Sequence, residues 1–257
     1  MLHRVVEGEQ GGPGERGGPV VLVHGFTQTL VSMEPLAARL RPRRAIRVDL
    51  PGHGGSASVR AGFAEAAALL GEAGGRAAYV GYSLGGRLCL RLALDRPDLV
   101  RALVLIGASP GLADPAERAA RRAADDALAA ELERAGLERF LDRWLAQPLF
   151  ATLPPERAGR AERLANAPEG LAASLRLNGT GAQEPLWERL AALRPPALLV
   201  AGARDGKFAA LARRMAAATG PTAQVALVGG AGHAVHLERP EAVADLVAAF
   251  LDGARGG

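Results

Sequence analysis

A serine between glycines, in the stretch Gly81-Tyr82-Ser83-Leu84-Gly85-Gly86, is the feature that most constrains the fold. The residues before it, 77–80, form an apolar run typical of a buried strand, and a helical pattern begins at Leu84. A strand that passes directly into a helix through G-x-S-x-G makes a tight, strained turn, and its glycines let neighbouring backbone approach. The sequence therefore predicts that Ser83 projects at the carboxyl end of a sheet, where open α/β folds place their ligands.

Three other predicted strand ends give this serine a context. In a chain with 33 glycines, the pentapeptide alone also fits an ordinary turn. However, the run 19–23 ends in His24-Gly25-Phe26, the run 197–202 leads into Asp205, and the run 223–228 leads to His233. Serine, aspartate and histidine thus follow separate strands in the order that α/β-hydrolases use.

The three residue types fit one chemistry. A serine hydroxyl needs an imidazole to take its proton, and a carboxylate to hold that imidazole in the right tautomer. Taken singly, Asp205 also fits a turn before Gly206, and His233 a surface histidine. Taken with Ser83, they predict a catalytic triad.

The loop after the first buried strand predicts the oxyanion hole. In this fold, one donor N–H comes from that loop and the other from the residue after the nucleophile. Here these are the backbone amides of Phe26 and Leu84. We expect His24 at the substrate site, where it fixes the loop by hydrogen bonding.

Length and composition predict one core domain with an insertion. The chain has 257 residues, about half of them apolar, which suffices for a large core. No apolar run reaches membrane-spanning length, and the N-terminus lacks a signal-peptide pattern, so a cytoplasmic protein without a membrane span is expected. The single cysteine, Cys89, is predicted to be a small core residue. No metal or cofactor is predicted, and the expected state is a monomer or weak homo-oligomer.

The net charge of +4 does not indicate a nucleic-acid partner. The arginines are dispersed among acidic residues, and no basic tract with interleaved aromatics occurs. Lys207 is the only lysine among 31 basic residues, which makes any one arginine a weak signal.

Alternating strand and helix patterns predict a mainly parallel sheet flanked by helices. A weak strand is predicted at 3–6. The other expected strands are 20–23, 45–49, 77–82, 102–106, 198–201 and 224–228, and the expected helices are 32–40, 63–70, 84–94, 208–218 and 240–251. Gly8 to Gly18 is expected to be a loop and Ala254 to Gly257 a frayed tail.

The segment between the strands ending at Ile106 and beginning near Ala197 carries no strand pattern. Its helical patterns, broken by Pro and Gly, cover 116–136, 137–145, 155–165 and 170–177. We therefore expect a core formed by 1–112 and 183–257 and an all-helical cap formed by 113–182, over the G-x-S-x-G turn.

Several motifs resemble one branch of the α/β-hydrolases. They are V-D-L-P-G-H-G-G-S at 48–56, V-G-Y-S-L-G-G-R at 80–87, A-S-P-G-L at 108–112, A-E-R at 116–118 running to Asp125, W-L-A-Q-P-L-F at 144–150, G-T-G-A-Q at 179–183, D-G-K-F at 205–208 and G-A-G-H at 230–233. Together they resemble the 2-succinyl-6-hydroxy-2,4-cyclohexadiene-1-carboxylate synthases of menaquinone biosynthesis, over nearly the whole chain. The cap motifs and D-G-K-F point to this branch, since the others are shared across the superfamily.

The resemblance implies a lyase that removes a proton beside a succinyl carbonyl and expels pyruvate from a small substrate with three carboxylates. A serine activated by histidine can act as a base, and an oxyanion hole can hold an enolate oxygen. The residues alone leave two alternatives open. One is a serine carboxylesterase or C–C bond hydrolase with Ser83 acylated, and the other is a non-catalytic binding protein of the same fold.

A substrate with three carboxylates needs fixed cations. Arg87 lies one helical turn after Ser83, Arg118, Arg121 and Arg122 share one face of a cap helix, and Lys207 follows Asp205 by two residues. A solvated helix face explains the cap arginines equally well, since the segment 113–181 holds eleven acids and ten arginines. The resemblance favours Arg87, Arg121 and Lys207 as carboxylate ligands with Arg163 as a fourth, and Tyr82 and Trp144 as pocket walls. The chain departs from the family pattern at Leu145, where an aromatic residue is common.

Overall fold

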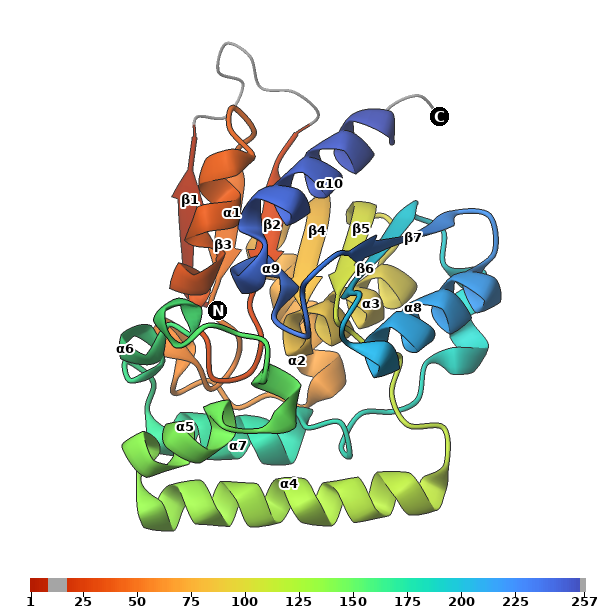
Figure 1. The fold of residues 1–257 in the computed structure, drawn as a ribbon. Helices are drawn as coiled ribbons and strands as arrows, with labels where there is room; N and C mark the ends of the chain where they lie inside the picture. The colour runs from red at the N-terminus through yellow and green to blue at the C-terminus, as the bar shows by residue number, and fades with distance from the viewer. Residues whose placement is uncertain (9–17, 255–257) are drawn as a thin grey trace.

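A seven-stranded sheet forms the centre of the computed structural model, which describes residues 1–8 and 18–254 (Figure 1). The strands lie in the order β1-β3-β2-β4-β5-β6-β7. Only β1 runs antiparallel to its neighbour, so the predicted mainly parallel α/β sheet is confirmed. The strands are β1 (Arg4–Glu7), β2 (Val20–Val23), β3 (Ala45–Val48), β4 (Ala77–Tyr82), β5 (Val100–Ile106), β6 (Ala197–Gly202) and β7 (Ala223–Val228).

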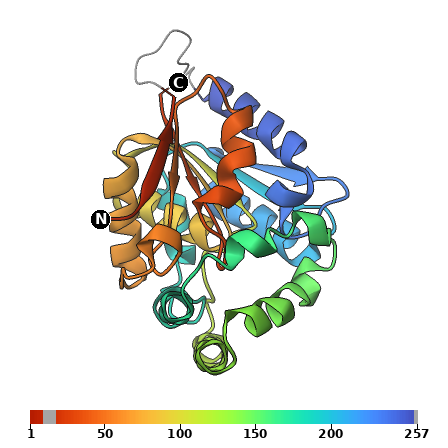
Figure 2. The ribbon, with the colours of Figure 1, turned by 90° about the vertical axis from the view of Figure 1, so that its left-hand side faces the viewer.

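Two helical layers cover the sheet, which explains why the central strands are apolar on both faces. Every residue of β2, β4 and β6 is buried. Helices α2 (Phe63–Gly74), α3 (Leu84–Asp95) and α8 (Gly206–Thr219) pack into the core on one face, and α1 (Glu34–Arg39) and α10 (Pro240–Gly253) into the core on the other. Figure 2 shows the sheet edge-on between these layers.

Four helices between β5 and β6 lie beyond the carboxyl ends of the parallel strands (Figure 1). They are α4 (Pro115–Ala135), α5 (Leu137–Leu145), α6 (Arg160–Arg163) and α7 (Pro168–Asn178). Asp114 caps α4 by accepting from the N–H groups of Ala116 and Glu117. A small apolar core of their own joins α4, α5 and α7. All four fall within 113–182, whose role as a separate cap stays a prediction.

The local differences from the predicted elements have physical causes. The helix predicted over 155–165 is instead a 3-10 turn, Pro155–Arg157, and the single turn α6, because Gly159 between them adopts a left-handed φ of 64°. The helix predicted from residue 32 begins as a 3-10 turn, Leu30–Met33, before α1. A short helix, α9 (Val235–Glu238), was not predicted.

Some sequence expectations fall outside the described chain. Most of the Gly8 to Gly18 loop and the end of the tail lie at 9–17 and 255–257, which the structure does not describe. Within residues 1–8 and 18–254, no helix combines the length and apolarity needed to cross a membrane.

The packing of α3 against β2 predicts a sharp penalty at one glycine. A Cβ on Gly85 would lie 2.5 Å from the carbonyl oxygens of both Val23 and His24, so backbone must move. We expect Gly85→Ala to lower the free energy of unfolding by about 1–3 kcal/mol, measured by urea denaturation. The control is Gly253→Ala in the last turn of α10, where a Cβ meets nothing within 4 Å. Equal stabilities of the two variants would contradict the packing argument.

Candidate active site

The turn between β4 and α3 places Ser83 in a strained backbone conformation. Its φ is 48° and its ψ −108°, and its N–H donates to the Ile106 carbonyl at 2.8 Å. A Cβ at Gly81 would lie 2.6 Å from backbone atoms of Gly85 and Gly86, which is why position 81 needs glycine. Ser83 thus stands at the carboxyl end of β4 with its side chain lining a cavity.

Asp205 and His233 meet at the ends of two further strands. Asp205 caps α8 by accepting from the Phe208 N–H at 3.1 Å, and its other oxygen accepts from His233 Nδ1 at 3.0 Å. Burial alone would raise the pKa of the Asp205 carboxyl, but the hydrogen bonds from His233 and Phe208 hold that pKa below its ordinary value. An ionised Asp205 fixes the His233 proton on Nδ1 and leaves Nε2 free to accept one.

Ser83 and His233 line the same cavity, which measures about 850 Å³ including its open mouth. The Ser83 hydroxyl has no hydrogen-bond partner within the described residues. Catalytic hydrogen bonds are often formed only once substrate is bound, so the shared cavity is the relevant observation.

The two predicted oxyanion donors also lie at this cavity, since Phe26 and Leu84 both line it. Leu84 is the first residue of α3, where a backbone N–H has no partner within its own helix. The Phe26 N–H shares a planar peptide unit with the Gly25 carbonyl and points the opposite way. That carbonyl accepts from His24 Nδ1 at 2.8 Å and from the Gln28 N–H at 3.2 Å, which fixes the direction of the Phe26 amide.

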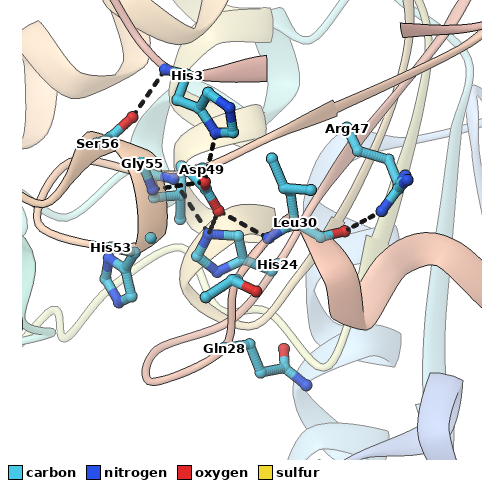
Figure 3. Close-up of polar contacts among 12 residues, drawn as sticks. His3, His24, Gln28, Leu30, Arg47, Asp49, His53, Gly55 and Ser56 are labelled. Carbon is cyan, nitrogen blue, oxygen red and sulfur yellow. Dashed lines mark hydrogen bonds and ion pairs between the residues drawn. The ribbon is translucent and has the colours of Figure 1, made fainter. Parts of the chain in front are cut away.

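His24 is buried and does not line the cavity. Figure 3 shows its ring beside Asp49. Its Nε2 accepts from the Leu50 N–H at 3.1 Å, while Nδ1 donates to Gly25. Burial lowers the pKa of His24, which keeps the ring neutral, and the two hydrogen bonds select this tautomer. Asp49 beside it accepts from the Leu30 N–H, the Gly55 N–H and His3 Nδ1, and so joins three loops.

A second buried histidine, His236, links this loop to His233, and the sequence patterns did not reveal it. Gln28 accepts from the Gly25 N–H at 2.9 Å and donates to His236 Nε2 at 3.2 Å. The His236 ring packs on Tyr82 at 4.1 Å between centroids, and Tyr82 contacts His233 at 5.4 Å. The spacing of His236, which lies in α9 three residues after His233, is the only sequence signal for this contact.

Three cationic side chains predicted from sequence line the cavity: Arg87, Arg121 and Lys207. Arg87 is buried and donates to Gln183 and to the Asn178 carbonyl, both at 2.8 Å. Burial, followed by the nearby charge of Arg121, lowers the pKa of Arg87 to about 10, so it stays charged at neutral pH. Arg121 donates to the buried carboxylate of Asp125 at 2.7 Å.

The charge balance at the cavity therefore rests on two residues. Asp125 offsets the charge of Arg121, whereas the hydrogen-bond partners of Arg87 are neutral. Among described residues, no carboxylate lies within 4.0 Å of the Lys207 amine, which stands above the Phe208 ring at 5.8 Å. Arg87 and Lys207 leave the cavity with net positive charge.

Aromatic walls complete the cavity. Tyr82 and Trp144, which the sequence predicts as pocket walls, line it together with Phe26 and Phe150. Trp144 contacts Phe26 at 5.1 Å, and its indole N–H is buried without a hydrogen-bond partner in the described chain. This N–H is available to a ligand oxygen.

Arg163, Arg118 and Arg122 do not line this cavity. Arg163 is 2% exposed and donates to the Ala158 carbonyl at 2.8 Å and to Thr27 Oγ1. Arg118 donates to the Leu112 carbonyl at 3.2 Å. Within the described residues, no group of three or more His, Cys, Asp or Glu side chains is arranged to hold a metal ion.

Fold and site together define a class. The chain belongs to the α/β-hydrolase family, because the family model described as "Alpha/beta hydrolase family" matches residues 20–246. Within that family, it resembles 2-succinyl-6-hydroxy-2,4-cyclohexadiene-1-carboxylate synthases. It is 37% identical to the synthase of Salmonella schwarzengrund over 265 aligned positions, covering 98% of this chain and 99% of the relative.

Solved structures show the same likeness. The structure of MenH from S. aureus superposes with a TM-score of 0.90 at 30% identity and covers all of both chains. A thermophilic esterase from Thermogutta terrifontis superposes with a TM-score of 0.79 at 25% identity, covering 98% of this chain and 93% of the other. The fold is thus shared with hydrolases, and the nearer likeness is to the synthases.

The buried histidines predict how stability depends on pH. Burial lowers the pKa values of His53 and His236 to about 3, whereas an unfolded histidine has a pKa of about 6.5. Between these values only the unfolded chain binds the proton, so stability present above pH 6.5 is lost as pH falls. Each residue contributes a slope of about 1.4 kcal/mol per pH unit. In urea denaturation at pH 7, 6 and 5, His53→Gln should show a slope shallower by about this amount. The control is His3→Gln, because the His3 ring is half-exposed. A slope in His53→Gln equal to that of the wild type would contradict the prediction.

Proposed function

We propose that this chain eliminates pyruvate from 2-succinyl-5-enolpyruvyl-6-hydroxy-3-cyclohexene-1-carboxylate, giving 2-succinyl-6-hydroxy-2,4-cyclohexadiene-1-carboxylate in menaquinone biosynthesis. The product is the compound that names its relatives. The observation that carries the proposal is one cavity lined by Ser83, His233 and three cationic side chains. The expected cytoplasmic location and weakly associating or monomeric state stay predictions.

The proposed base is Ser83 together with His233. The ring proton beside the succinyl ketone is acidic because its removal gives an enolate. His233 Nε2 takes the serine proton as the serine oxygen takes the substrate proton, and Asp205 stabilises the imidazolium that forms. The enolate electron pair then forms the C2=C3 double bond, the C3=C4 pair shifts to C4=C5, and the C5–O bond breaks with its electrons on the leaving oxygen. The enolpyruvyl group leaves as the enolate of pyruvate, which takes up a proton, so no water is consumed.

The proposed oxyanion hole, formed by the amides of Phe26 and Leu84, holds the enolate oxygen of the succinyl ketone. The Gly25 carbonyl, held by His24, keeps the Phe26 N–H pointed in one direction before substrate arrives. Such preorganised donors stabilise developing negative charge without a reorganisation cost. This is the same role that the pair plays toward a tetrahedral intermediate in an ester hydrolase.

The three substrate carboxylates are proposed to bind Arg87, Arg121 and Lys207. Arg87 offers a planar fork of donors at the cavity wall, and Lys207 offers a point charge with no described carboxylate within 4.0 Å of its amine. An esterase with neutral substrates has no use for these charges, which favours the lyase over the carboxylesterase alternative.

Ser83→Ala tests the chemistry directly. We expect kcat for pyruvate release to fall about 10²- to 10⁴-fold, because a positioned general base is lost, while KM stays within a few fold. Pyruvate is measured by coupled reduction with NADH and lactate dehydrogenase. Wild-type turnover of aryl esters without pyruvate release would overturn the lyase proposal and support a serine hydrolase.

Lys207→Met tests the recognition of carboxylates. We expect kcat/KM for pyruvate release to fall roughly 10- to 100-fold, the scale of one charge-assisted hydrogen bond. The unfolding midpoint should not change, because the amine has no ion-pair partner among described residues. The control is Arg204→Met. Arg204 is exposed, lies three residues before Lys207 and does not line the cavity. Equal losses in the two variants would indicate a long-range charge effect and remove Lys207 from the site.

A further inference from the structure

Thr27 has a backbone conformation that is costly for its residue type. Its φ is 68°, and within the described residues the only other non-glycine residue with positive φ is Ser83. A β-branched side chain is strained there, and such a residue persists only where its surroundings hold it. Thr27 directly follows Phe26, and its φ orients the Phe26–Thr27 peptide, which is the next unit along the chain from the one that carries the proposed oxyanion donor.

Two side chains from the cap hold Thr27. Arg163, at the end of α6, donates to Thr27 Oγ1, and the same nitrogen lies 3.5 Å from the Phe26 carbonyl oxygen. Asn166, three residues later, donates to the Thr27 carbonyl at 2.8 Å. The hydroxyl and the carbonyl oxygen of Thr27 therefore both accept hydrogen bonds from cap side chains.

The two cap residues are themselves fixed from several sides. Arg163 donates through Nε to the Ala158 carbonyl at 2.8 Å. Asn166 accepts from the Gly54 N–H at 2.9 Å and donates also to the Arg163 carbonyl at 3.0 Å. The Gly54 contact orients the amide, so its nitrogen must face Thr27.

A third residue of the same cap segment also contacts this loop. Glu162 accepts from the N–H and the hydroxyl of Thr29, both at 3.2 Å. One short cap segment therefore contacts the loop at Phe26, Thr27 and Thr29. Arg163 meets these groups rather than the cavity, which it does not line.

We propose that Arg163 and Asn166 are positioning residues that hold Thr27 in its left-handed conformation and thereby aim the Phe26 N–H at the oxyanion. The cap then forms part of the oxyanion hole in addition to covering the cavity. This inference rests on the proposed function, because it takes the Phe26 amide as an oxyanion donor.

Arg163→Met tests the role of the guanidinium. We expect kcat for pyruvate release to fall about 10- to 100-fold, with KM within about threefold, since the lost interaction acts through a transition-state donor. Arg160→Met is the matched control, because Arg160 lies in the same helix and pairs with Asp142 on the surface. It should retain wild-type kcat and KM. A raised KM with unchanged kcat in Arg163→Met would overturn the proposal and assign Arg163 to a substrate carboxylate.

A neutral fluorophosphonate provides a readout that does not depend on the proposed substrate. It phosphonylates Ser83 with its phosphoryl oxygen in the oxyanion hole, and it carries no carboxylate. The labelling rate of Arg163→Met should fall by a factor similar to that of its kcat, while Arg160→Met labels at the wild-type rate. If the wild type releases no pyruvate but this labelling difference holds, the proposed function fails and the positioning role stands. Equal labelling rates would overturn the positioning role, and a wild type that neither labels nor releases pyruvate would overturn both.

Thr27→Gly separates positioning from general loss of structure. Glycine adopts positive φ without strain, so the loop no longer needs Arg163 to hold it. We expect the double variant Thr27→Gly/Arg163→Met to have a kcat at least threefold above that of Arg163→Met alone, whether or not Arg163→Met is less stable than the wild type. No recovery in the double variant, with both proteins folded by circular dichroism, would overturn the proposal.

Discussion

The contact between Gly85 and the end of β2 is the constraint on which the active site depends. The Gly85 N–H donates to the His24 carbonyl at 3.1 Å, and the two backbones lie too close for a Cβ between them. This contact places the first turn of α3, with the Leu84 amide, beside the loop that carries the Phe26 amide. The strained turn at Ser83 and the spacing of the proposed oxyanion hole are therefore two results of one close packing.

Around this rigid centre, the cavity combines charge with apolar walls. Arg87 and Lys207 lie on α3 and α8, which flank the sheet, whereas Arg121 lies on α4 and has its charge offset by Asp125. Aromatic rings of Phe26 and Trp144 close the other side. Cations surrounded by such walls interact more strongly with carboxylates than they would in water. The same cavity would penalise a neutral, extended acyl chain by leaving those charges unpaired.

The sequence predicted those parts of the molecule that local patterns determine. The strand ends carrying Ser83, Asp205 and His233 were found because glycine spacing and apolar runs are local signals. The direction of Arg163 was not found, because a break at Gly159 reorients the helix that carries it and turns the guanidinium toward Thr27. The pairing of Gln28 with His236 joins residues 208 positions apart, and no periodicity reports such a contact.

What separates an elimination from a hydrolysis at this site is the atom presented to Ser83, because the triad and the paired amides serve either reaction. A carbonyl carbon above the hydroxyl leads to an acyl-enzyme, whereas an acidic C–H there leads to an enolate. In the proposed site, both routes place a carbonyl oxygen between the Phe26 and Leu84 amides. Under the proposed binding mode, the choice therefore lies in how Arg87, Arg121 and Lys207 fix the rest of the substrate. Three carboxylates held at three points leave a rigid ring little freedom to rotate, which is how charges remote from the reacting bond select the reaction.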